Sequence, residues 1–468
     1  MTTTEHGPAA LGEATLAELA QSVRGALLGP EVDGYDEARS IWNGAHDRRP
    51  ALILRAAGVA DVIKGVQFAR SENLPLAIRG GGHSIPGFST VDDGLVLDLS
   101  ALKGVRVDPE RKLVTAQAGN TWKDFDQETQ AFGLAVTGGL VSSTGIAGFT
   151  LGGGIGWLVR RAGLTADNLV SADVVTADGR FLRASAEEHP DLFWALRGGG
   201  GNFGVVTSFE YALHDVGPTV FAGGVFYSGD HAAEILDGYR KVSAAAPDAL
   251  STVVNLTTAP PVPFLPESVH GKPIVAILGM WSGPLAEGDG HTRGLRELAP
   301  PIADLFGPMP YVAMQSLIDP LYPRGIHNYF RSAFMPTLDT SMESILRSYG
   351  TLPNPLTEMH IHHLGGAVSR IPSDATAFAT RDAEFILNVV ARTPDANGFG
   401  TVVDWARAVT DGLGADARAY VNYTGEASVD RVRASYPEGT YDRLVTVKDR
   451  YDPTNLFRLN QNIKPSQP

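Results

Sequence analysis

The stretch GLVSSTGIAGFTLGGGIGWL at residues 139–158 is the most informative part of this chain. It contains no charged side chain and is rich in glycine. A backbone with so few bulky side chains can lie flat against a planar aromatic ring. Its segment GGGIG at 152–156 can also curl successive N–H groups into a nest that holds an anion. The alternative is a buried, glycine-rich crossover between two elements of secondary structure.

A second glycine cluster, RGGGHS at residues 79–84, lies upstream. It follows the apolar run LPLAI, which predicts a strand. Three glycines after a strand free consecutive N–H groups to hold a pyrophosphate. His83 would then end the loop within reach of the ring of the same ligand. The alternative is a tight turn that a histidine happens to follow.

A third cluster, GGGNFG at residues 199–204, matches the pattern G-x-G-x-x-G. A dinucleotide site of the Rossmann type needs a strand before this pattern and a helix after it. Here HPDLFWALRGGG predicts a helix before the pattern, and GVVTSFEYALH predicts a strand after it. The order is reversed, so we exclude a Rossmann site. The sequence also lacks a Walker A pattern and a G-x-S-x-G nucleophile elbow.

The composition is that of a globular protein with an acidic surface. The chain has 468 residues, too many for one ordinary core, so about two domains are expected. Hydrophobic residues make up 43% and charged residues 19%. The formal net charge is -14, and Lys and Arg are scattered among carboxylates. Nucleic acids and anionic membranes bind clustered cations, so we exclude both classes of partner.

Cysteine is absent from the chain. Its absence excludes disulfide bonds, thiolate zinc sites, iron–sulfur clusters and thiol nucleophiles. It also fits a reducing compartment, so we expect a cytoplasmic protein. The N-terminal sequence MTTTEHGPAALGEATLAELA lacks the basic start and apolar core of a signal peptide. No apolar run approaches the roughly 20 residues that span a bilayer.

The periodicity of apolar residues predicts an α+β fold. Residues 13–28 predict an amphipathic helix. Strands of a sheet covered on one face are predicted at PTVFAGGVFYS, STVVNLTTA and KPIVAILGMWSG. Helices are predicted near 230–246 and 339–350. The character of the chain changes near residue 215 and again near the C-terminus. We therefore expect one domain at 1–215, a second at 216–415, and a segment at 416–468 that returns to the first.

Several segments, taken in order, match a known group of flavoproteins. They are RGGGHS at 79–84, GLVSSTGIAGFTLGGGIGWL at 139–158, GLTADNLVSADVVTADG at 163–179, DLFWALRGGGGNFGVVT at 191–207, YVNY at 420–423 and YDPTNLFRLNQNIKP at 451–465. By these segments the chain resembles the vanillyl-alcohol oxidase/p-cresol methylhydroxylase superfamily, in particular its berberine-bridge-enzyme-like branch of FAD-linked oxidases. The resemblance covers nearly the whole chain and is weakest across 215–350.

The resemblance implies a fold and a cofactor. It implies a two-part FAD-binding domain and an inserted substrate domain, in which an antiparallel sheet flanked by helices covers the isoalloxazine ring. The candidate FAD-binding residues come from the glycine motifs and the C-terminal segment. They are His83, Arg79, Gly80, Gly81, Gly82, Ser84, Gly87, Val141, Ser142, Thr144, Gly145, Gly148, Gly152, Gly153, Asn202, Gly204, Val206, Asn460 and Asn462. The amides of Asn460 and Asn462 would bond flavin carbonyls, or else simply end the chain.

The resemblance also implies a covalent flavin. In this branch the histidine of RGGGHS bonds the 8α-methyl carbon of the flavin, and here that residue is His83. Many members add a cysteine bond to flavin C6, but the matching position here is Val141. We therefore expect a single covalent link. An electron-withdrawing histidyl bond favours the reduced flavin and prevents loss of the cofactor, whose own chemistry carries out the redox step.

A proton acceptor is expected in the C-terminal motif. Hydride leaves a C–H bond more easily when a neighbouring O–H or N–H gives up its proton to a base within hydrogen-bonding reach. The family places a catalytic tyrosine here, which favours Tyr423 with Tyr420 second. On the predicted strand ARAYVNYTG the two would face opposite sides. The alternative for each is a tyrosine that packs a sheet, because a phenol with a pKa near 10 must be perturbed to act as a base.

Other polar residues are weaker candidates for the substrate side. Asn388 lies in RDAEFILNVVA, a segment in which the family resemblance implies a catalytic glutamate. Leu387, Asn388 and Val389 stand there instead, which argues against berberine-like ring closure and against a carboxylate base. His360 and His362 would share a face of one strand, with His363 opposite. Zinc needs a third or fourth ligand that the spacing does not supply, so we expect no metal site. Lining of a substrate cavity and ordinary packing both stay open for these histidines.

These features predict an FAD-dependent oxidase of secondary metabolites or sugars. An alcohol or phenol would lose hydride to flavin N5, and dioxygen would then yield hydrogen peroxide. Thr144 resembles a position that lines the approach of oxygen, and its small size favours an oxidase over a dehydrogenase. A flavin-dependent oxygenase and a catalytically silent, small-molecule-binding flavoprotein are the alternatives. The sequence leaves a monomer and a homodimer equally open.

Overall fold

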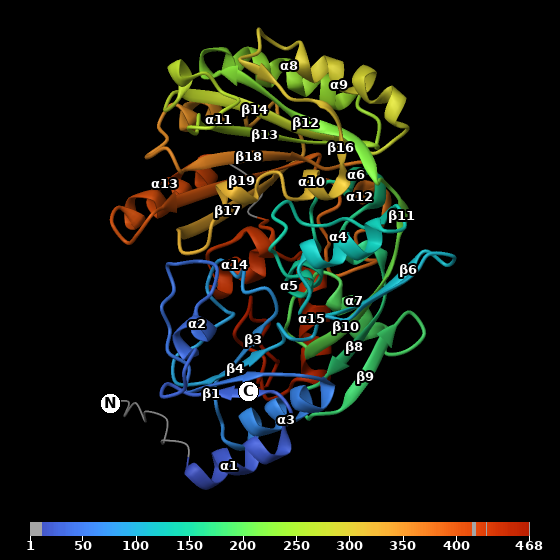
Figure 1. The fold of residues 1–468 in the computed structure, drawn as a ribbon, viewed down its shortest axis with the longest axis vertical. Helices are drawn as coiled ribbons and strands as arrows, with labels where there is room; N and C mark the ends of the chain where they lie inside the picture. Colours follow the sequence, from blue (N-terminus) through green and yellow to red (C-terminus); the bar gives the residue numbers. More distant parts are fainter. Residues whose placement is uncertain (1–11, 414–417, 427, 468) are drawn as a thin grey trace.

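The chain folds into two halves stacked along the long axis of the molecule (Figure 1). The fold is known from a computed structural model that describes residues 12–413, 418–426 and 428–467. The lower half is built from both ends of the chain, and the upper half from its middle (Figure 1). The architecture is α+β, as the sequence predicts.

The first sheet of the lower half is mainly parallel. Its order is β1-β2-β4-β3, with β2, β4 and β3 parallel and β1 antiparallel at the edge. The strands are β1 (Ala26–Leu28), β2 (Leu52–Arg55), β3 (Leu76–Arg79) and β4 (Leu95–Asp98). Helix α3 (Val59–Ser71) connects β2 to β3 and buries Val62, Val66 and Ala69 at helical spacing. RGGGHS begins with the last residue of β3, so its glycines lie at the carboxyl edge of this sheet.

The second sheet of the lower half is antiparallel, with the order β5-β6-β10-β8-β9. Its strands are β5 (Val105–Asp108), β6 (Leu113–Gln117), β8 (Leu169–Val175), β9 (Phe181–Ser185) and β10 (Val205–Ala212). In the described chain, four α-helices lie between these strands in sequence: α4 (Trp122–Gln130), α5 (Ile146–Leu151), α6 (Val159–Ala162) and α7 (Pro190–Leu196). A hairpin turn joins β8 to β9, where Gly179 has φ 80° as such turns require.

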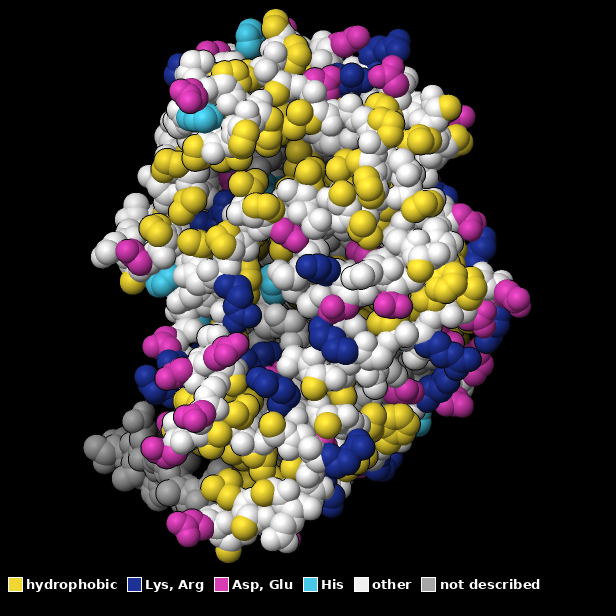
Figure 2. Space-filling view, viewed as in Figure 1, with side chains coloured by type: hydrophobic (Ala, Val, Ile, Leu, Met, Phe, Trp, Pro, Cys, Tyr) yellow, Lys and Arg dark blue, Asp and Glu magenta, His cyan; other side chains and the backbone are white. Residues whose placement is uncertain are grey.

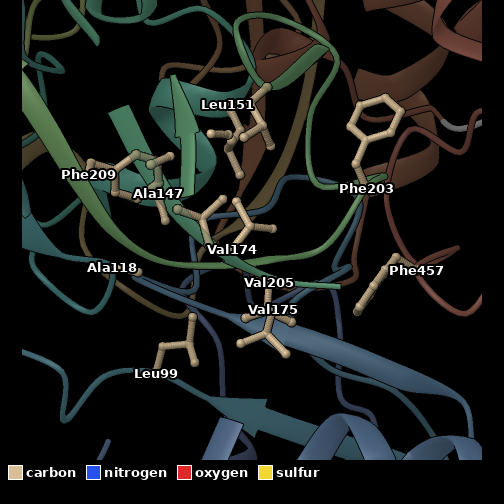
Figure 3. Close-up of a cluster of buried hydrophobic side chains, with 14 of the residues drawn as sticks. Leu99, Ala118, Ala147, Leu151, Val174, Val175, Phe203, Val205, Phe209 and Phe457 are labelled. Atoms are coloured by element: carbon tan, nitrogen blue, oxygen red, sulfur yellow. The ribbon is translucent and has the colours of Figure 1, made fainter. Parts of the chain in front are cut away.

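Buried side chains from these strands and helices form the core of the lower half. Figure 3 shows Val174 and Val175 of β8 together with Leu99, Ala118 and Phe209 in this cluster. Phe457 of the C-terminal segment belongs to the same core. Burying one large aliphatic or aromatic side chain contributes about 1.5–3 kcal/mol, so this core joins segments that are distant in sequence.

The upper half is an antiparallel sheet of eight strands. The order is β15-β12-β14-β13-β18-β19-β17, and β16 also pairs with β12. The strands are β12 (Thr219–Ser228), β13 (Leu250–Thr258), β14 (Pro273–Trp281), β15 (Ala303–Asp304), β16 (Gly307–Pro310), β17 (His327–Met335), β18 (Glu358–His363) and β19 (Phe385–Thr393). Four helices pack with its outer side (Figure 1). They are α8 (Ala232–Ala244), α9 (Gly288–Arg296), α11 (Met342–Tyr349) and α13 (Phe399–Asp411).

One face of this sheet packs against the helices, and the other face lines a cavity. On β19, Leu387 and Val389 belong to the core beneath the helices, whereas Asn388 and Val390 point to the other face and line a cavity. On β18, Met359 and Ile361 likewise belong to the helix-covered core. Successive side chains of a strand point to opposite faces, so the polar residues of β18 and β19 are turned toward the lower half.

The C-terminal segment returns to the lower half through η6 (Val421–Tyr423), α14 (Val429–Ala434) and α15 (Glu438–Tyr451). Helix α15 packs against α7, and Asp452 is its C-cap residue. The predicted boundaries at 1–215, 216–415 and 416–468 stay predictions, although the strands change sheet between β10 and β12.

Two predicted elements differ in the structure. The helix expected over 13–28 is helix α1 (Glu13–Ser22) followed by strand β1. It ends because the N–H groups of Arg24 and Gly25 donate to the carboxylate of Asp61, which draws the chain into the sheet. The strand expected at ARAYVNYTG is the 3-10 turn η6, and residues 414–417 before it lie outside the described residues.

The visible surface mixes charges of both signs. Figure 2 shows Lys and Arg side chains interspersed with Asp and Glu on this face. Such mixing leaves no broad cationic area here of the kind that binds a phosphate backbone. In the part of the chain that the structure describes, no helix is both long and apolar enough to cross a membrane.

Candidate functional site

A cavity of about 330 Å³ lies between the two halves of the molecule. One part of its wall comes from the glycine loop after β3, from helix α5 and from the C-terminal residues 457–461. The other part comes from β17, β18, β19 and η6. The cavity therefore joins the predicted FAD motifs to the polar face of the upper sheet, and most of its lining is apolar.

The two glycine motifs touch each other on the cavity wall. A Cβ on Gly81 would lie 2.3 Å from the backbone N of Gly145, and a Cβ on Gly145 would lie 2.3 Å from the backbone N of Gly81. Only glycine permits this approach, because no real Cβ comes so near another atom. Gly148 differs, since a Cβ there meets nothing within 4 Å. The glycines thus bring two loops together and leave room beside them for a bulky ligand.

His83 lies on the cavity wall in a defined orientation. Its ring stacks on the indole of Trp42, with the ring centroids 4.8 Å apart and the planes at 15°. Its Nε2 is 3.0 Å from the hydroxyl of Ser143. Burial, with a contribution from Arg324, lowers the pKa of His83 to about 3. The imidazole is therefore neutral at pH 7, and Nδ1 has no hydrogen-bond partner among the described residues.

These residues fit FAD. The two glycine loops meet without side chains between them, and a side chain at this contact would fill the space. A planar ring or a pyrophosphate that approaches the backbone closely needs such a space. The buried Oδ1 atoms of Asn460 and Asn462 have no protein donor among the described residues. A buried acceptor without a partner costs about 1–3 kcal/mol, and a bound ligand with N–H groups would remove that cost. Asn460 lines the cavity and Asn462 lies beside it in sequence.

Tyr420 and Tyr423 lie on the same side of η6. Their rings are 4.9 Å apart and nearly perpendicular. Residues three apart are eclipsed in a 3-10 helix, whereas a strand would have placed them on opposite faces, so that expectation was wrong. The Tyr420 hydroxyl accepts hydrogen bonds from the N–H of Gly154 at 2.8 Å and from the amide of Asn422 at 2.9 Å. Tyr420 therefore clamps η6 to the glycine stretch, and only Tyr423 lines the cavity.

The surroundings of Tyr423 are neutral. Its ring is 5.5 Å from the ring of His362, and burial lowers the pKa of His362 to about 3. Burial, with a further contribution from Tyr420, raises the pKa of Tyr423 above its usual value. A base needs the opposite shift. The protein groups around Tyr423 thus supply none of the positive charge that would favour a phenolate.

The upper sheet places His360, His362 and Asn388 on the cavity wall. His360 and His362 share one face of β18, as expected from their spacing, and their ring centroids are 6.0 Å apart. The buried Nε2 of His362 and the buried Oδ1 of Asn388 have no partner among the described residues. Both are free to bond a ligand. The described residues contain no group of three or more His, Cys, Asp or Glu placed to hold a metal.

A charged network lies behind His360. The Tyr322 hydroxyl donates to Oε1 of Glu358 at 2.5 Å and is 3.1 Å from Nε2 of His360. Arg392 donates to the same carboxylate oxygen at 2.7 Å, and Asn255 donates to Oε2 at 2.8 Å. Burial alone would raise the pKa of Glu358, but the charge of Arg392 and the hydrogen bond from Tyr322 lower it, and the pKa lies well below its usual range. Glu358 is therefore a buried carboxylate anion.

The structure separates the predicted site residues into two groups. Those that line the cavity are His83, Gly80, Gly81, Gly82, Ser84, Val141, Thr144, Gly145, Gly148, Gly204, Val206, Asn388, Tyr423 and Asn460. Those that do not are Arg79, Gly87, Ser142, Gly152, Gly153, Asn202, Asn462 and Tyr420. Their roles as cofactor or catalytic residues stay predictions.

Several residues of the second group support the wall instead. The hydroxyl and N–H of Ser142 bind the carboxylate of Asp319, at 2.5 and 2.8 Å. Asn202 is fully buried, and its amide bonds the backbone of Gln461 and Ile463. A Cβ on Gly152 would lie 2.2 Å from the amide of Asn422. These residues fix the segments that carry the lining.

Sequence reasoning missed part of the wall. Trp42, Tyr322, Phe330 and Tyr436 line the cavity, but they lie in segments without a glycine motif or polar pattern. Ser143 was also missed, although it lies inside the stretch 139–158. The available signal for Ser143 was its place between Ser142 and Thr144, which were both candidate FAD-binding residues.

Comparison with known proteins identifies the family. The model described as FAD binding domain matches residues 50–185, and the model described as berberine and berberine like matches residues 419–464. An FAD-linked oxidoreductase of Dictyostelium discoideum is 31% identical over 456 residues, which are 96% of this chain and 97% of that protein. (R)-6-hydroxynicotine oxidase of Paenarthrobacter nicotinovorans is 29% identical over 462 residues, 95% of this chain and 97% of that protein.

Solved structures show the same fold. The crystal structure of 6-hydroxy-D-nicotine oxidase from Arthrobacter nicotinovorans has a TM-score of 0.86 at 28% identity, covering 95% of this chain and 99% of that one. The xylooligosaccharide oxidase from Myceliophthora thermophila shares the fold, with a TM-score of 0.85 at 23% identity, 97% of this chain and 100% of that one. The chain belongs to the berberine-bridge-enzyme-like branch of the vanillyl-alcohol oxidase/p-cresol methylhydroxylase superfamily, and it is an FAD-linked oxidoreductase.

Proposed function

We propose that this protein is an oxidase that holds FAD by one covalent bond to His83. The observation that carries the proposal is the state of His83: a neutral imidazole on the cavity wall, stacked on Trp42, with Nε2 beside Ser143 and Nδ1 free. A free, neutral ring nitrogen is the nucleophile that a histidyl–flavin bond needs. With no cysteine in the chain and Val141 at the second attachment position, one bond is expected.

The residues that would hold FAD are those of the glycine loops and the C-terminal segment. Gly81 and Gly145 form the narrow part of the cradle, and Asn460 offers an unpaired acceptor. When bound, FAD takes hydride from a substrate C–H bond and passes the electrons to dioxygen, giving hydrogen peroxide. The protein positions the two reactants and excludes water between its halves.

The other wall of the cavity indicates a small, hydroxylated substrate with an apolar body. Trp42, Ile318 and Phe330 supply apolar surface, while His360, His362 and Asn388 offer bonding atoms. Among the described residues, the lining contains no Lys or Arg side chain that would pair with an anionic substrate. We therefore propose an alcohol or phenol of secondary metabolism, or a sugar. Relatives named for oxidising 6-hydroxynicotine and xylooligosaccharides support both substrate classes.

Acid precipitation of the purified holoprotein tests the covalent bond. We expect the yellow colour to stay in the pellet of the wild type and of a His231→Ala control, whose side chain is 42% exposed and does not line the cavity. The His83→Ala variant should release its flavin into the supernatant. Release from the wild type would remove the tether but leave an FAD protein. Failure of the folded protein to bind FAD at all would overturn the proposal.

Peroxide yield separates the oxidase from its alternatives. We expect one hydrogen peroxide for each molecule oxidised when the wild type is given (R)-6-hydroxynicotine, xylobiose or 4-hydroxybenzyl alcohol. A flavin-dependent oxygenase would incorporate oxygen into the product and release less peroxide. A catalytically silent flavoprotein would bind the compound without anaerobic bleaching of its flavin. Oligomeric state is open, and size-exclusion chromatography with light scattering would decide between a monomer and a homodimer.

A further inference from the structure

Three side chains form a continuous hydrogen-bonded chain from the cavity to a buried anion. Tyr322, which follows η5 (Asp319–Leu321), donates its one hydroxyl proton to Glu358 at 2.5 Å. The remaining contact of that hydroxyl, to Nε2 of His360 at 3.1 Å, must then use the lone pair of the tyrosine oxygen. The hydrogen on His360 therefore lies on Nε2.

This tautomer leaves Nδ1 of His360 with a lone pair. The residue lines the cavity, and Nδ1 has no hydrogen-bond partner among the described residues. A neutral imidazole with one nitrogen held by the protein and the other free is the arrangement of a general base. The free nitrogen is the acceptor, and the held nitrogen fixes the ring.

The carboxylate of Glu358 lies close enough to His360 to stabilise a positive charge on its ring. Oε1 of Glu358 is 3.5 Å from Nε2 of His360. The side chain of Glu358 is only 5% exposed, so water screens its charge little. Arg392 keeps the carboxylate ionised and also lies 4.4 Å over the ring of Tyr322. A buried carboxylate anion thus lies directly behind the ring of His360.

We propose that His360 takes the proton of the substrate during oxidation, and that Tyr322 and Glu358 position its ring and balance its charge. This inference rests on the proposed oxidase function. The O–H bond of the substrate breaks, and the proton forms a bond to Nδ1 of His360. The C–O bond of the substrate becomes a carbonyl, while the C–H hydrogen leaves with two electrons to the FAD of the proposed function.

Tyr423 is the competing proton acceptor. Its nearest rings, those of Tyr420 and His362, are neutral, and burial raises its pKa. No cation is hydrogen-bonded to its hydroxyl among the described residues. Tyr423 is suited to donate a hydrogen bond to the substrate, whereas His360 is suited to accept its proton.

Histidine NMR of the holoenzyme, labelled with nitrogen-15, tests the resting state without any substrate. We expect His360, assigned with a His360→Gln variant, to be protonated on Nε2 alone. Glu358→Gln retains an acceptor for Tyr322 but removes the charge, so His360 should stay protonated on Nε2 while anaerobic bleaching of the flavin slows. A proton on Nδ1 in the wild type, or no effect of Glu358→Gln, would overturn the proposal.

His360 is surrounded by side chains from three strands and one loop. The charged or titratable neighbours are Glu358 and His362 on β18, Arg392 on β19 and Tyr322 after η5. The register partners are the amides of Asn255 on β13 and Asn388 on β19. Tyr322→Phe removes the acceptor for Nε2 while leaving the carboxylate, so it should mix the two tautomers. The two variants thus separate orientation from charge.

Anaerobic bleaching of the flavin tests the proton transfer itself. We use whichever of the two alcohols, xylobiose or 4-hydroxybenzyl alcohol, bleaches the wild type, because each has the H–C–O–H unit that the step requires. His360→Gln should slow bleaching by about 100-fold or more, within the usual range for loss of a general base. Imidazole in the buffer should partly restore the rate of a His360→Gly variant. The exposed control His231→Gln should bleach at the wild-type rate.

The outcomes distinguish the inference from the function beneath it. If His360→Gln bleaches within threefold of the wild type while Tyr423→Phe loses 100-fold, the base is Tyr423 and the proposal is wrong. If the wild type holds no covalent flavin or neither alcohol bleaches it, the proposed function fails on this panel. The NMR result then still decides the state of His360. Should His360→Gln not fold, Tyr322→Phe gives the same decision, since its mixed tautomers should slow bleaching if His360 is the base.

Discussion

Asp126 of helix α4 lies out of contact with solvent, at 1% exposed, and faces α10 (Tyr311–Gln315) of the inserted part of the chain. Its Oδ2 accepts a hydrogen bond from the amide of Gln315 at 2.8 Å, while its Oδ1 has no partner among the described residues. Burial raises the pKa of Asp126 to about 7 from its usual 3.8, and the bond from Gln315 offsets little of that shift. The residue lies outside the cavity, so its ionisation acts on stability.

The sign of the effect follows from the direction of the shift. The native state binds this proton more tightly than the unfolded state, so the contribution is fully present below pH 3.8 and is lost as the pH rises toward 7. Asp126→Asn keeps the acceptor for Gln315 and stays neutral at every pH. Relative to the wild type, it should gain stability from pH 4 to 7, by up to about 4 kcal/mol at about 1.4 kcal/mol per pKa unit.

Urea unfolding of both proteins at pH 5, 6, 7 and 8 measures this difference. Asp215→Asn is the matched control, because Lys112 lowers the pKa of that exposed carboxylate. Its effect should have the opposite sign and be much smaller. A stability difference between Asp126→Asn and the wild type that does not change from pH 5 to 8 would contradict the interpretation.

At the scale of elements, the contact between the loop after β3 and the start of α5 determines the shape of the cofactor cradle. The loop carries Gly81, and Gly145 is the N-cap of α5. The N–H of Ile146 donates to the carbonyl of Asn120, which fixes the helix start from the other side. Both loops must therefore keep their backbones in contact, and a side chain at this point has no space.

Two alanine substitutions separate folding from cofactor binding. Gly145→Ala should destabilise the protein and abolish FAD binding, since its Cβ would lie 2.3 Å from the backbone of Gly81. Gly148→Ala on the same helix should fold normally, because its Cβ meets no protein atom within 4 Å. It should nevertheless weaken FAD binding, as its methyl group projects into the cavity lining. Thermal unfolding of the apoproteins and FAD titration measure the two effects; equal behaviour of the variants would contradict this account.

At the scale of the whole molecule, a buried ion pair anchors the returning C-terminal segment. The side chains of Lys448 and Asp452 are both 0% exposed and 2.7 Å apart. Lys448 also donates to the carbonyls of Asn202 at 2.8 Å and Phe457 at 2.9 Å. Asp452 accepts from two backbone N–H groups of the same segment. The pair therefore joins helix α15 to a glycine motif more than two hundred residues earlier.

Lys448→Met tests this anchor. Removing one partner leaves Asp452 buried without a counter-charge, so unfolding should become easier by about 3–5 kcal/mol. FAD retention should also fall, because residues 457–461 form part of the cavity wall. The control is Arg450→Met. The side chain of Arg450 is 62% exposed, so its ion pair with Asp191 should contribute about 1 kcal/mol or less to the free energy of unfolding. Urea unfolding and the flavin-to-protein absorbance ratio report both effects, and equal losses in the two variants would refute the role of the buried pair.

The sequence by itself determined the FAD half of this protein. Three local features indicated the cofactor: glycines at 80–82 after a strand, the uncharged stretch 139–158, and His83. Such features are readable because a loop that cradles a ligand needs particular residues in consecutive positions. The α+β class followed in the same way, from the periodicity of apolar residues within each element.

Only the tertiary structure decided how the polar side chains of the upper half are arranged. The chain Tyr322–Glu358–His360 joins a loop to a strand, and His83 meets Trp42 and Ser143 from separate segments. No local pattern encodes these contacts, because pairing of β13, β18 and β19 brings together residues far apart in the chain. The 3-10 turn that places Tyr423 beside Tyr420 was equally hidden. Local sequence specifies elements and ligand loops, whereas the charge around a buried side chain depends on which distant residues fold against it.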